Sequence, residues 1–287
     1  MYRSLLLVIM MQMRPSSLRH PAEAEFVSTV WQHYHTHGRH DLPWRKTTNP
    51  YRILVSEMML QQTQVVRVIP KYQSFLRQFP NIQALALAPL AEVLLAWQGL
   101  GYNRRAKYLK EAATVVHTLR HGRWPRSVDV LVELPGVGPY TAGAVAAFAY
   151  NQPVPIIETN IRTVYLRHFF PNVTNVSDAA IMELVRATLD QANPRDWYYA
   201  LMDYGAYLKQ TVGNSNHQSK HYAKQSPFKG SDRAVRGAIM RHVLEAPGSL
   251  SVLARQVGVD QEKLRKILAS LVRDQLIVKQ GNRYYVA

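Results

Sequence analysis

The chain has no cysteine among its 287 residues. Because thiolates are the ligands of iron–sulfur clusters and of Cys-type zinc sites, this absence excludes both, together with disulfides and any thiol nucleophile. No run of about 18 or more apolar residues is present either, so the sequence predicts no transmembrane helix. His33, His35, His37 and His40 lie close together but lack the spacing of a zinc-binding helix. We therefore expect no metal site.

Acidic residues are few. The chain has 19 Asp and Glu against 35 Lys and Arg, a formal net charge of +16. This excess favours a polyanionic partner, with nucleic acid the first candidate and an anionic membrane surface the second. Hydrophobic residues make up 47% of the chain, enough for a sizeable core. The length suits two compact domains, or one domain with an appendage.

Residues 1–21 carry no acidic side chain and contain a short apolar run. A targeting signal has a similar composition, but no small-residue cleavage site follows this run. We interpret the segment as an N-terminal extension, with Met10, Met11 and Met13 as alternative start residues.

Helical patterning extends from residue 22 to residue 208. An apolar stripe opens it, formed by Phe26, Val27, Val30, Trp31 and Tyr34. A single helix is expected over residues 83–97. The alternation of apolar and polar residues that is typical of strands is absent down to residue 208, so the sequence predicts a mainly α fold.

The C-terminal part differs in character. Residues 209–230 are polar and basic and are expected to form a strap or linker. Residues 231–287 follow the pattern helix–turn–helix, then hairpin, which predicts a small winged-helix-like α+β module. From residue 209 to the end, Lys and Arg exceed Asp and Glu by 9. We expect this module to bind DNA or to serve as a packing module; the alternative is a helical cap that does not contact a DNA groove.

One stretch, residues 134–160, combines a Gly-rich hairpin (134–138), a helix of small residues (140–149) and a single carboxylate, Glu158. Such a hairpin can offer backbone N–H groups to a phosphate, since glycine allows a tight turn and a close approach. A carboxylate beside it could act on the bound nucleic acid. The alternative is that the glycines only turn the chain and that Glu158 lies on the surface.

The beginning of this stretch is one of five motifs that follow one another in a fixed order along the chain. They are Leu-Pro-Trp-Arg (42–45), Ser-Glu-Met-Met-Leu-Gln-Gln-Thr-Gln-Val (56–65), Gly-Leu-Gly-Tyr (99–102), Leu-Pro-Gly-Val-Gly-Pro-Tyr-Thr-Ala-Gly (134–143) and, more loosely, residues 200–206. With them the chain resembles the DNA glycosylase superfamily that includes endonuclease III and MutY, and the first four motifs are MutY-like.

The resemblance implies two helical lobes with a DNA-binding cleft between them. The central lobe would span residues 51–165, and the second lobe would combine residues 22–50 with 166–208. The target nucleotide would be flipped out of the duplex into the cleft.

The resemblance also implies the catalytic residues. Glu57 stands where the family has the general acid that protonates adenine, a role that needs a carboxyl with a raised pKa in a closed pocket. The alternative is an ordinary glutamate on a helix surface. Glu158 stands where the family has an aspartate that stabilises the oxocarbenium-like sugar. It is one methylene longer, which shifts the charge, and Asn160 would support both the carboxylate and the sugar.

Tyr140 occupies the position at which bifunctional relatives have a lysine nucleophile. A tyrosine cannot form a Schiff base, and Lys107 and Lys110 are elsewhere on the chain. The resemblance therefore implies a monofunctional enzyme that leaves an abasic site uncut.

Three groups of binding residues follow from the same resemblance. The first wedges into the duplex, the second grips its backbone and the third lines the base pocket; for each aromatic among them the alternative is core packing. The groups are Gln62 and Tyr102; Pro135, Gly136, Val137 and Gly138; and Trp44, Arg45, Leu60 and Tyr199.

The chain departs from the family in three further ways. Lys209 stands where the first cluster cysteine would be, and the strap 209–230 is expected to take over the contacts of the cluster loop. The C-terminal part is too short for the family's domain that checks for 8-oxoguanine. Tyr199 replaces a polar residue that would contact adenine.

The resulting prediction is a monofunctional DNA glycosylase that removes adenine mispaired with 8-oxoguanine or guanine. The alternatives are a thymine or uracil glycosylase acting on G mismatches, and an inactive lesion-binding protein. We expect a monomer that binds double-stranded DNA and no membrane, in the bacterial cytoplasm with the nucleoid. No cofactor is expected, although the hairpin carbonyls are compatible with a monovalent cation.

Overall fold

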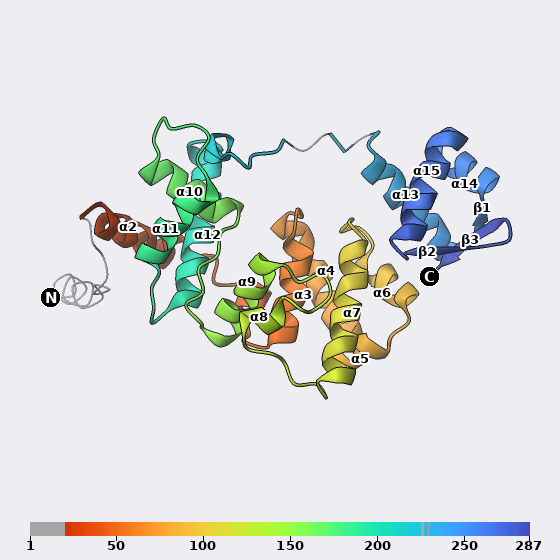
Figure 1. Ribbon diagram of the computed structural model, residues 1–287, viewed down its shortest axis with the longest axis horizontal. Coiled ribbons are helices and arrows are strands. Elements are labelled where there is room, and N and C mark those ends of the chain that lie inside the picture. The colour runs from red at the N-terminus through yellow and green to blue at the C-terminus, as the bar shows by residue number, and fades with distance from the viewer. Residues whose placement is uncertain (1–20, 225–226, 229) are drawn as a thin grey trace. The chain divides into compact units, whose positions relative to one another are not determined.

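The computed structural model describes residues 21–224, 227–228 and 230–287, so the predicted extension lies outside the described residues except for Pro21. The described chain is mainly helical, with one small antiparallel sheet near its C-terminus (Figure 1). This confirms the predicted fold class. None of the described helices is long and apolar enough to cross a membrane.

The chain divides into two compact units. Unit 1 comprises Met1–Thr48 and Ala142–Ala223, and unit 2 comprises Asn49–Thr141 and Lys224–Ala287. The division falls inside helix α9 (Pro139–Tyr150), whereas the sequence placed the end of the central lobe at residue 165.

Unit 1 is a helical packing around α10, which contacts α11, α12 and the short helix η2, while α2 contacts α11 and α12 (Figure 1). Its core includes Val30, Ile161 and Trp197, all fully buried. On α2 the predicted stripe is buried except for Trp31, which is half-buried. The helices are α2 (Pro21–His37), η1 (Pro43–Lys46), α10 (Thr159–Phe169), α11 (Asp178–Thr188), α12 (Pro194–Thr211) and η2 (Ser215–Gln218).

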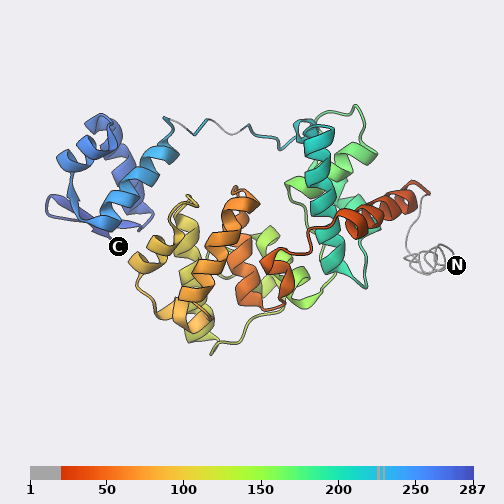
Figure 2. The ribbon, with the colours of Figure 1, turned by 180° about the vertical axis from the view of Figure 1, so that it is seen from behind.

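In the first part of unit 2, helix α7 contacts α3, α5 and α6, and α4 contacts α3 and α6 (Figure 2). The prediction of one helix over 83–97 is wrong, because Pro89 has no N–H to continue the helix and adopts an extended conformation between α5 and α6. The bounds are α3 (Pro50–Leu60), α4 (Val65–Gln78), α5 (Ile82–Leu87), α6 (Leu90–Trp97), α7 (Arg104–Leu119) and α8 (Val128–Leu131).

The C-terminal part of unit 2 has the predicted winged-helix pattern, three helices and a sheet of order β1-β3-β2. Strand β1 was not predicted, because two residues are too short to show alternation. The elements are α13 (Asp232–Glu245), β1 (Gly248–Ser249), α14 (Leu250–Val257), α15 (Gln261–Arg273), β2 (Ile277–Gln280) and β3 (Arg283–Val286).

Side-chain caps fix the starts of many helices. An oxygen of each capping residue accepts a hydrogen bond from a backbone N–H of the first turn, which has no partner within the helix. The caps are Asn49 for α3, Asn81 for α5, Glu158 for α10, Ser177 for α11, Ser231 for α13, Ser249 for α14 and Asp260 for α15. Glu158, a candidate site residue, thus also stabilises the start of α10.

The first part of the predicted strap is folded rather than extended. Helix α12 continues to Thr211, and η2 packs on α10. The buried side chain of Asn216 donates from Nδ2 to the carbonyl oxygen of Thr159 at 3.1 Å and to Oγ1 of Thr163 at 2.7 Å. Residues after α12 therefore brace the helix that begins beside Glu158.

Candidate active site

Glu57 lies on α3, a helix buried from Ile53 to Met59. Its own exposure is 7%, so it is not the surface residue of the alternative interpretation. The Tyr140 hydroxyl, from the first turn of α9, donates to Oε2 of Glu57 at 3.1 Å. A carboxyl group in this setting can exchange a proton with a bound base, and the tyrosine helps to fix its orientation.

The hairpin between α8 and α9 is anchored in the core by the buried side chains of Leu134 and Val137. Gly136 has φ +72°, and a Cβ at this position would lie 2.4 Å from Cβ of Tyr108. Only glycine satisfies both the dihedral angle and the close approach to α7. Pro135 is half-buried and Gly138 exposed, so the hairpin presents backbone at the surface, as a phosphate contact requires.

The Glu158 carboxylate caps α10. Its Oε1 accepts from the backbone N–H groups of Asn160 and Ile161 at 2.6 and 2.9 Å. Its Oε2 accepts from Oγ1 of Thr159 at 3.0 Å and from Nδ2 of Asn160 at 3.3 Å. The N-terminus of a helix favours a negative charge. The half-buried carboxylate is therefore held in place by backbone and by the side chain of Asn160.

Lys209, on the last turn of α12, completes this cluster. Its Nζ donates to Oδ1 of Asn160 at 2.8 Å. Burial lowers the pKa of Lys209, and the charge of Glu158 acts in the opposite direction. The helices meet closely at Gly205, where a Cβ would lie 2.3 Å from the carbonyl oxygen of Asn160. The sequence indicated only that Lys209 replaces a cysteine; its contact with Asn160 was not foreseen.

Gln62 and Tyr102 are exposed, and each has a positive φ, 54° and 50°. Gln62 lies between α3 and α4, and Tyr102 between α6 and α7. The Tyr102 hydroxyl accepts from Nη1 of Arg233, on α13, at 2.8 Å. Tyr102 is 37% exposed as a residue, which does not fit the core-packing alternative.

Arg45 and Tyr199, both expected in the base pocket, contact each other in the interior of unit 1. The Arg45 guanidinium lies 4.4 Å from the centre of the Tyr199 ring, and the ring stacks on Phe148 at 4.7 Å. Arg45 also makes two hydrogen bonds to Asp203, at 2.7 and 2.8 Å. These contacts fit a structural role for both residues.

Asp203 was given no role by the sequence, although it lies in the fifth motif. Its side chain is 2% exposed and also pairs with Arg39 at 2.6 Å. Burial alone would raise the pKa of Asp203, but the hydrogen bonds and charges of Arg45 and Arg39 outweigh burial and lower it. The carboxylate therefore joins α12 to the segment that carries Trp44, which is 5% exposed.

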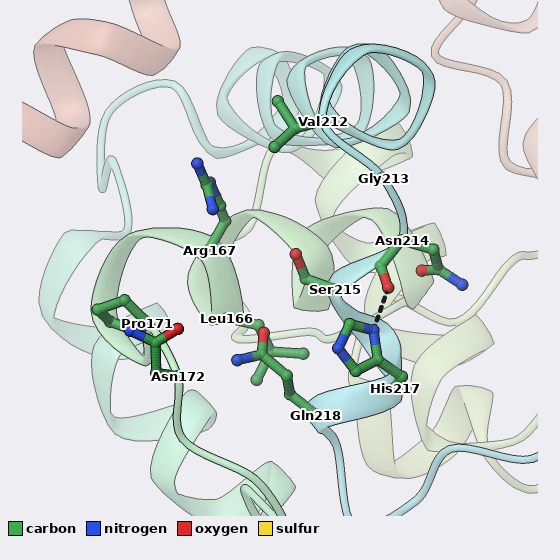
Figure 3. A pocket seen from close by; sticks show the side chains of 10 residues that line it. All are labelled: Leu166, Arg167, Pro171, Asn172, Val212, Gly213, Asn214, Ser215, His217 and Gln218. Atoms are coloured by element: carbon green, nitrogen blue, oxygen red, sulfur yellow. Dashed lines mark hydrogen bonds between the residues drawn. The ribbon is translucent and has the colours of Figure 1, made fainter.

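A pocket of about 250 Å³ opens between the end of α10 and the segment after α12 (Figure 3). Nδ1 of His217 is hydrogen-bonded to the carbonyl oxygen of Asn214 at 2.6 Å on one side of it. The lining residues are Leu166, Arg167, Pro171, Asn172, Val212, Gly213, Asn214, Ser215, His217 and Gln218. Neither Glu158 nor Asn160 is among them, so this pocket is separate from the candidate site.

The structure thus joins three pairs of predicted residues: Glu57 with Tyr140, Glu158 with Asn160, and Arg45 with Tyr199. Leu60 is half-buried at the end of α3. Within the described residues no group of three or more His, Cys, Asp or Glu side chains is arranged to hold a metal ion.

Known proteins resemble this chain in sequence and in fold. A model of the HhH-GPD superfamily base excision DNA repair protein matches residues 55–187. The chain is 44% identical over 176 residues to the adenine DNA glycosylase of Mycolicibacterium smegmatis, covering 60% of each chain. It is 37% identical over 226 residues to the human adenine DNA glycosylase, covering 74% of this chain and 40% of the relative. The chain spans about half the length of the curated relatives it matches.

Solved structures are similar as well. A thermostable thymine-DNA glycosylase has a TM-score of 0.61 and 30% identity, covering 70% of this chain and 96% of that one. A non-covalent endonuclease III–DNA complex has a TM-score of 0.52 at 18% identity, covering 70% of this chain and 86% of that one. The second likeness concerns the fold alone.

Proposed function

Because the chain belongs to the HhH-GPD superfamily of base excision DNA repair proteins, we propose that it is an adenine DNA glycosylase. It would flip adenine mispaired with 8-oxoguanine or guanine out of the duplex and release it by hydrolysis. The observation that carries the proposal is the buried carboxyl group of Glu57, which accepts a hydrogen bond from the hydroxyl of Tyr140 at the start of α9.

Glu57 is the general acid in this proposal. Adenine is a poor leaving group unless a ring nitrogen is protonated, and a carboxyl group withdrawn from water can deliver that proton. The Tyr140 hydroxyl, 3.1 Å from Oε2, holds the carboxyl in one orientation.

Glu158 is the electrostatic stabiliser. Loss of the base leaves positive charge on the sugar, and a fixed carboxylate lowers the energy of that state without reorganisation. The cap on α10 supplies the fixed position, and Asn160 supports one carboxylate oxygen.

We propose that the enzyme has no β-lyase activity. Tyr140 offers no amine, Lys107 is paired with Glu111 at 3.0 Å, and Lys110 donates to the Ala86 carbonyl at 3.3 Å. Lys209 is the amine to exclude, because it lies beside Asn160 and Glu158. Borohydride should trap no covalent adduct with abasic DNA; an adduct that disappears in Lys209→Met would contradict this part of the proposal.

A second candidate is a thymine or uracil glycosylase acting on G mismatches. The observation in its favour is the coverage: the chain matches 96% of the thymine-DNA glycosylase, but about half of the adenine-specific relatives. Much of the length of the adenine DNA glycosylases therefore has no counterpart in this chain.

Single-turnover assays on four duplexes separate the candidates. With A:8-oxoguanine, A:G, T:G and U:G duplexes, we expect base release from the first two. Release confined to T:G and U:G would establish the second candidate. Binding to lesion DNA without release from any duplex would establish the inactive lesion-binding protein instead.

The partner in this proposal is double-stranded DNA, bound by a monomer in the cytoplasm where the chromosome lies. No thiolate is available in this sequence for an iron–sulfur cluster. A monovalent cation bound to the carbonyl oxygens of the hairpin stays a prediction from the sequence.

A further inference from the structure

Two exposed loops of unit 2 each contain a residue with an unusual backbone conformation. Gln62 and Tyr102 have φ values of 54° and 50°. Residues other than glycine rarely adopt this left-handed region, and they remain there when the surrounding structure holds them. The two loops lie far apart in sequence, yet each exposes the side chain of a residue with this backbone conformation.

One buried side chain binds both loops. Arg105, on the first turn of α7, is 8% exposed. In the first loop it donates from Nη1 to the carbonyl oxygen of Gln61 at 2.5 Å and from Nη2 to Oγ1 of Thr63 at 3.3 Å. The contacts fall on the residues directly before and after Gln62.

The same guanidinium holds the second loop. Nη2 of Arg105 donates to the carbonyl oxygens of Leu100 and Gly101 at 3.3 and 3.2 Å. Its central carbon lies 5.3 Å from the centre of the Tyr102 ring. Nη1 also donates to the carbonyl oxygen of Met58 at 2.6 Å, which ties both loops to the end of α3.

The chemistry of arginine suits this place. Among the described residues Arg105 forms no ion pair with a carboxylate, and its charge is met by backbone oxygens. Burial lowers the pKa of Arg105 to about 10, so the side chain stays protonated at neutral pH. The planar fork of donors reaches several acceptors at once, which the single nitrogen of lysine cannot do.

We propose that Arg105 is a positioning residue for base flipping: it fixes Gln62 and Tyr102 in the geometry with which they enter the duplex. This inference rests on the proposed function. The side chain acts through the two loops and needs no contact with DNA.

The test compares two targets in the full-length protein. Flipping costs least when the target is already unpaired. Arg105→Lys should therefore slow adenine release from an A:G duplex by about tenfold or more, because misplaced groups lose rate steeply. Release of adenine opposite an abasic site should change much less. An equal loss on both duplexes, or no loss, would overturn the inference.

A matched control is Tyr51→Phe, which removes another buried hydrogen bond of unit 2, from the Tyr51 hydroxyl to the Phe79 carbonyl at 2.7 Å. It should not distinguish the two targets. If Arg105→Lys does not fold, as judged by a thermal melt, Thr63→Val takes its place and should show the same selective loss at smaller size; without that selectivity the inference fails.

The inference also predicts non-additivity. In a background of Gln62→Ala with Tyr102→Ala, the further change Arg105→Lys should have little effect, because the groups it positions are gone. An undiminished effect would overturn the inference. If the wild-type protein releases no base from any duplex, the proposed function itself fails, which is a distinct result.

Discussion

Glu158 caps α10, and the proposed function gives the same side chain a second role as electrostatic stabiliser. One oxygen caps α10, and the other is bound by Thr159 and Asn160. Relative to the aspartate that the resemblance implies at this position, Glu158 has an additional methylene, and a hydrogen-bond network that includes Lys209 holds the longer side chain. This arrangement favours an adapted carboxylate over a defective one.

We therefore predict that Glu158→Asp slows base release, because the shorter side chain withdraws the charge while still capping the helix. A displacement of this size can cost roughly a hundredfold in rate. Single-turnover kinetics measure the rate, and a thermal melt checks that the cap survives. Faster release in the variant would mean that Glu158 is a defect.

At the residue scale, the sequence predicted which residues belong to the candidate site better than it predicted which side chains they contact. Glu57, Tyr140 and Asn160 were found by motif, and the structure places each beside another predicted residue. Arg105 could not be found this way, since an arginine at the start of a basic helix is indistinguishable from a solvated one. The role proposed for Arg105 depends on two loops that its guanidinium contacts only in the folded chain.

Asp203 connects two elements of unit 1, α12 and the segment that contains η1. Removing one partner of a buried ion pair leaves the other charge unpaired, which costs about 3 kcal/mol or more. We predict that Asp203→Asn lowers the melting temperature clearly. Asp178→Asn is the control, because the Asp178 side chain is 36% exposed and its ion pair with Arg162 is only partly buried. Equal effects of both variants would contradict the prediction.

The pH dependence of this connection follows from the lowered pKa of Asp203. A carboxyl whose pKa is lower in the folded state stabilises the protein above its unfolded pKa of about 3.9. The stabilisation is lost as the pH falls through the folded value. The difference in melting temperature between wild type and Asp203→Asn should therefore be constant near neutral pH and shrink below about pH 4.

The Gly-rich hairpin at residues 134–138 leads to a separate prediction. Gly136→Ala should weaken duplex binding and lower the melting temperature, because the new methyl group meets Tyr108. Gly122→Ala is the control: it has a similar φ, +76°, but nothing lies within 4 Å of the added Cβ. Calorimetry and fluorescence anisotropy measure both. If the two variants behave alike, the close packing of the hairpin is unimportant.

Elements were predictable where their signals are local. Prolines, glycines and apolar stripes located most helices, and the C-terminal pattern of helices and hairpin was recognised correctly. The fold of residues 209–218 onto α10 was not, because a polar, basic segment resembles a linker. Its order comes from contacts such as those of Asn216 with Thr159 and Thr163, which no local pattern reveals.

At the scale of the whole molecule, the charge of +16 is the dominant feature. Each phosphate contact of a duplex-binding protein contributes about 0.9 to the slope of log affinity against log salt. If the C-terminal module touches DNA, the double change Lys279→Gln with Arg283→Gln, at the exposed β2–β3 hairpin, should make this slope shallower by roughly 2. An unchanged slope would indicate a helical cap without contact to DNA.

The proposed function depends most of all on Glu57, which would deliver a proton to the departing adenine. The most direct test is single-turnover adenine release from an A:8-oxoguanine duplex by Glu57→Gln, with Glu92→Gln, an exposed glutamate on α6, as the control for the loss of charge. We predict that Glu57→Gln binds the duplex as wild type does but releases adenine at least about a hundredfold more slowly, the loss typical of a missing general acid. Release at the wild-type rate would contradict the account.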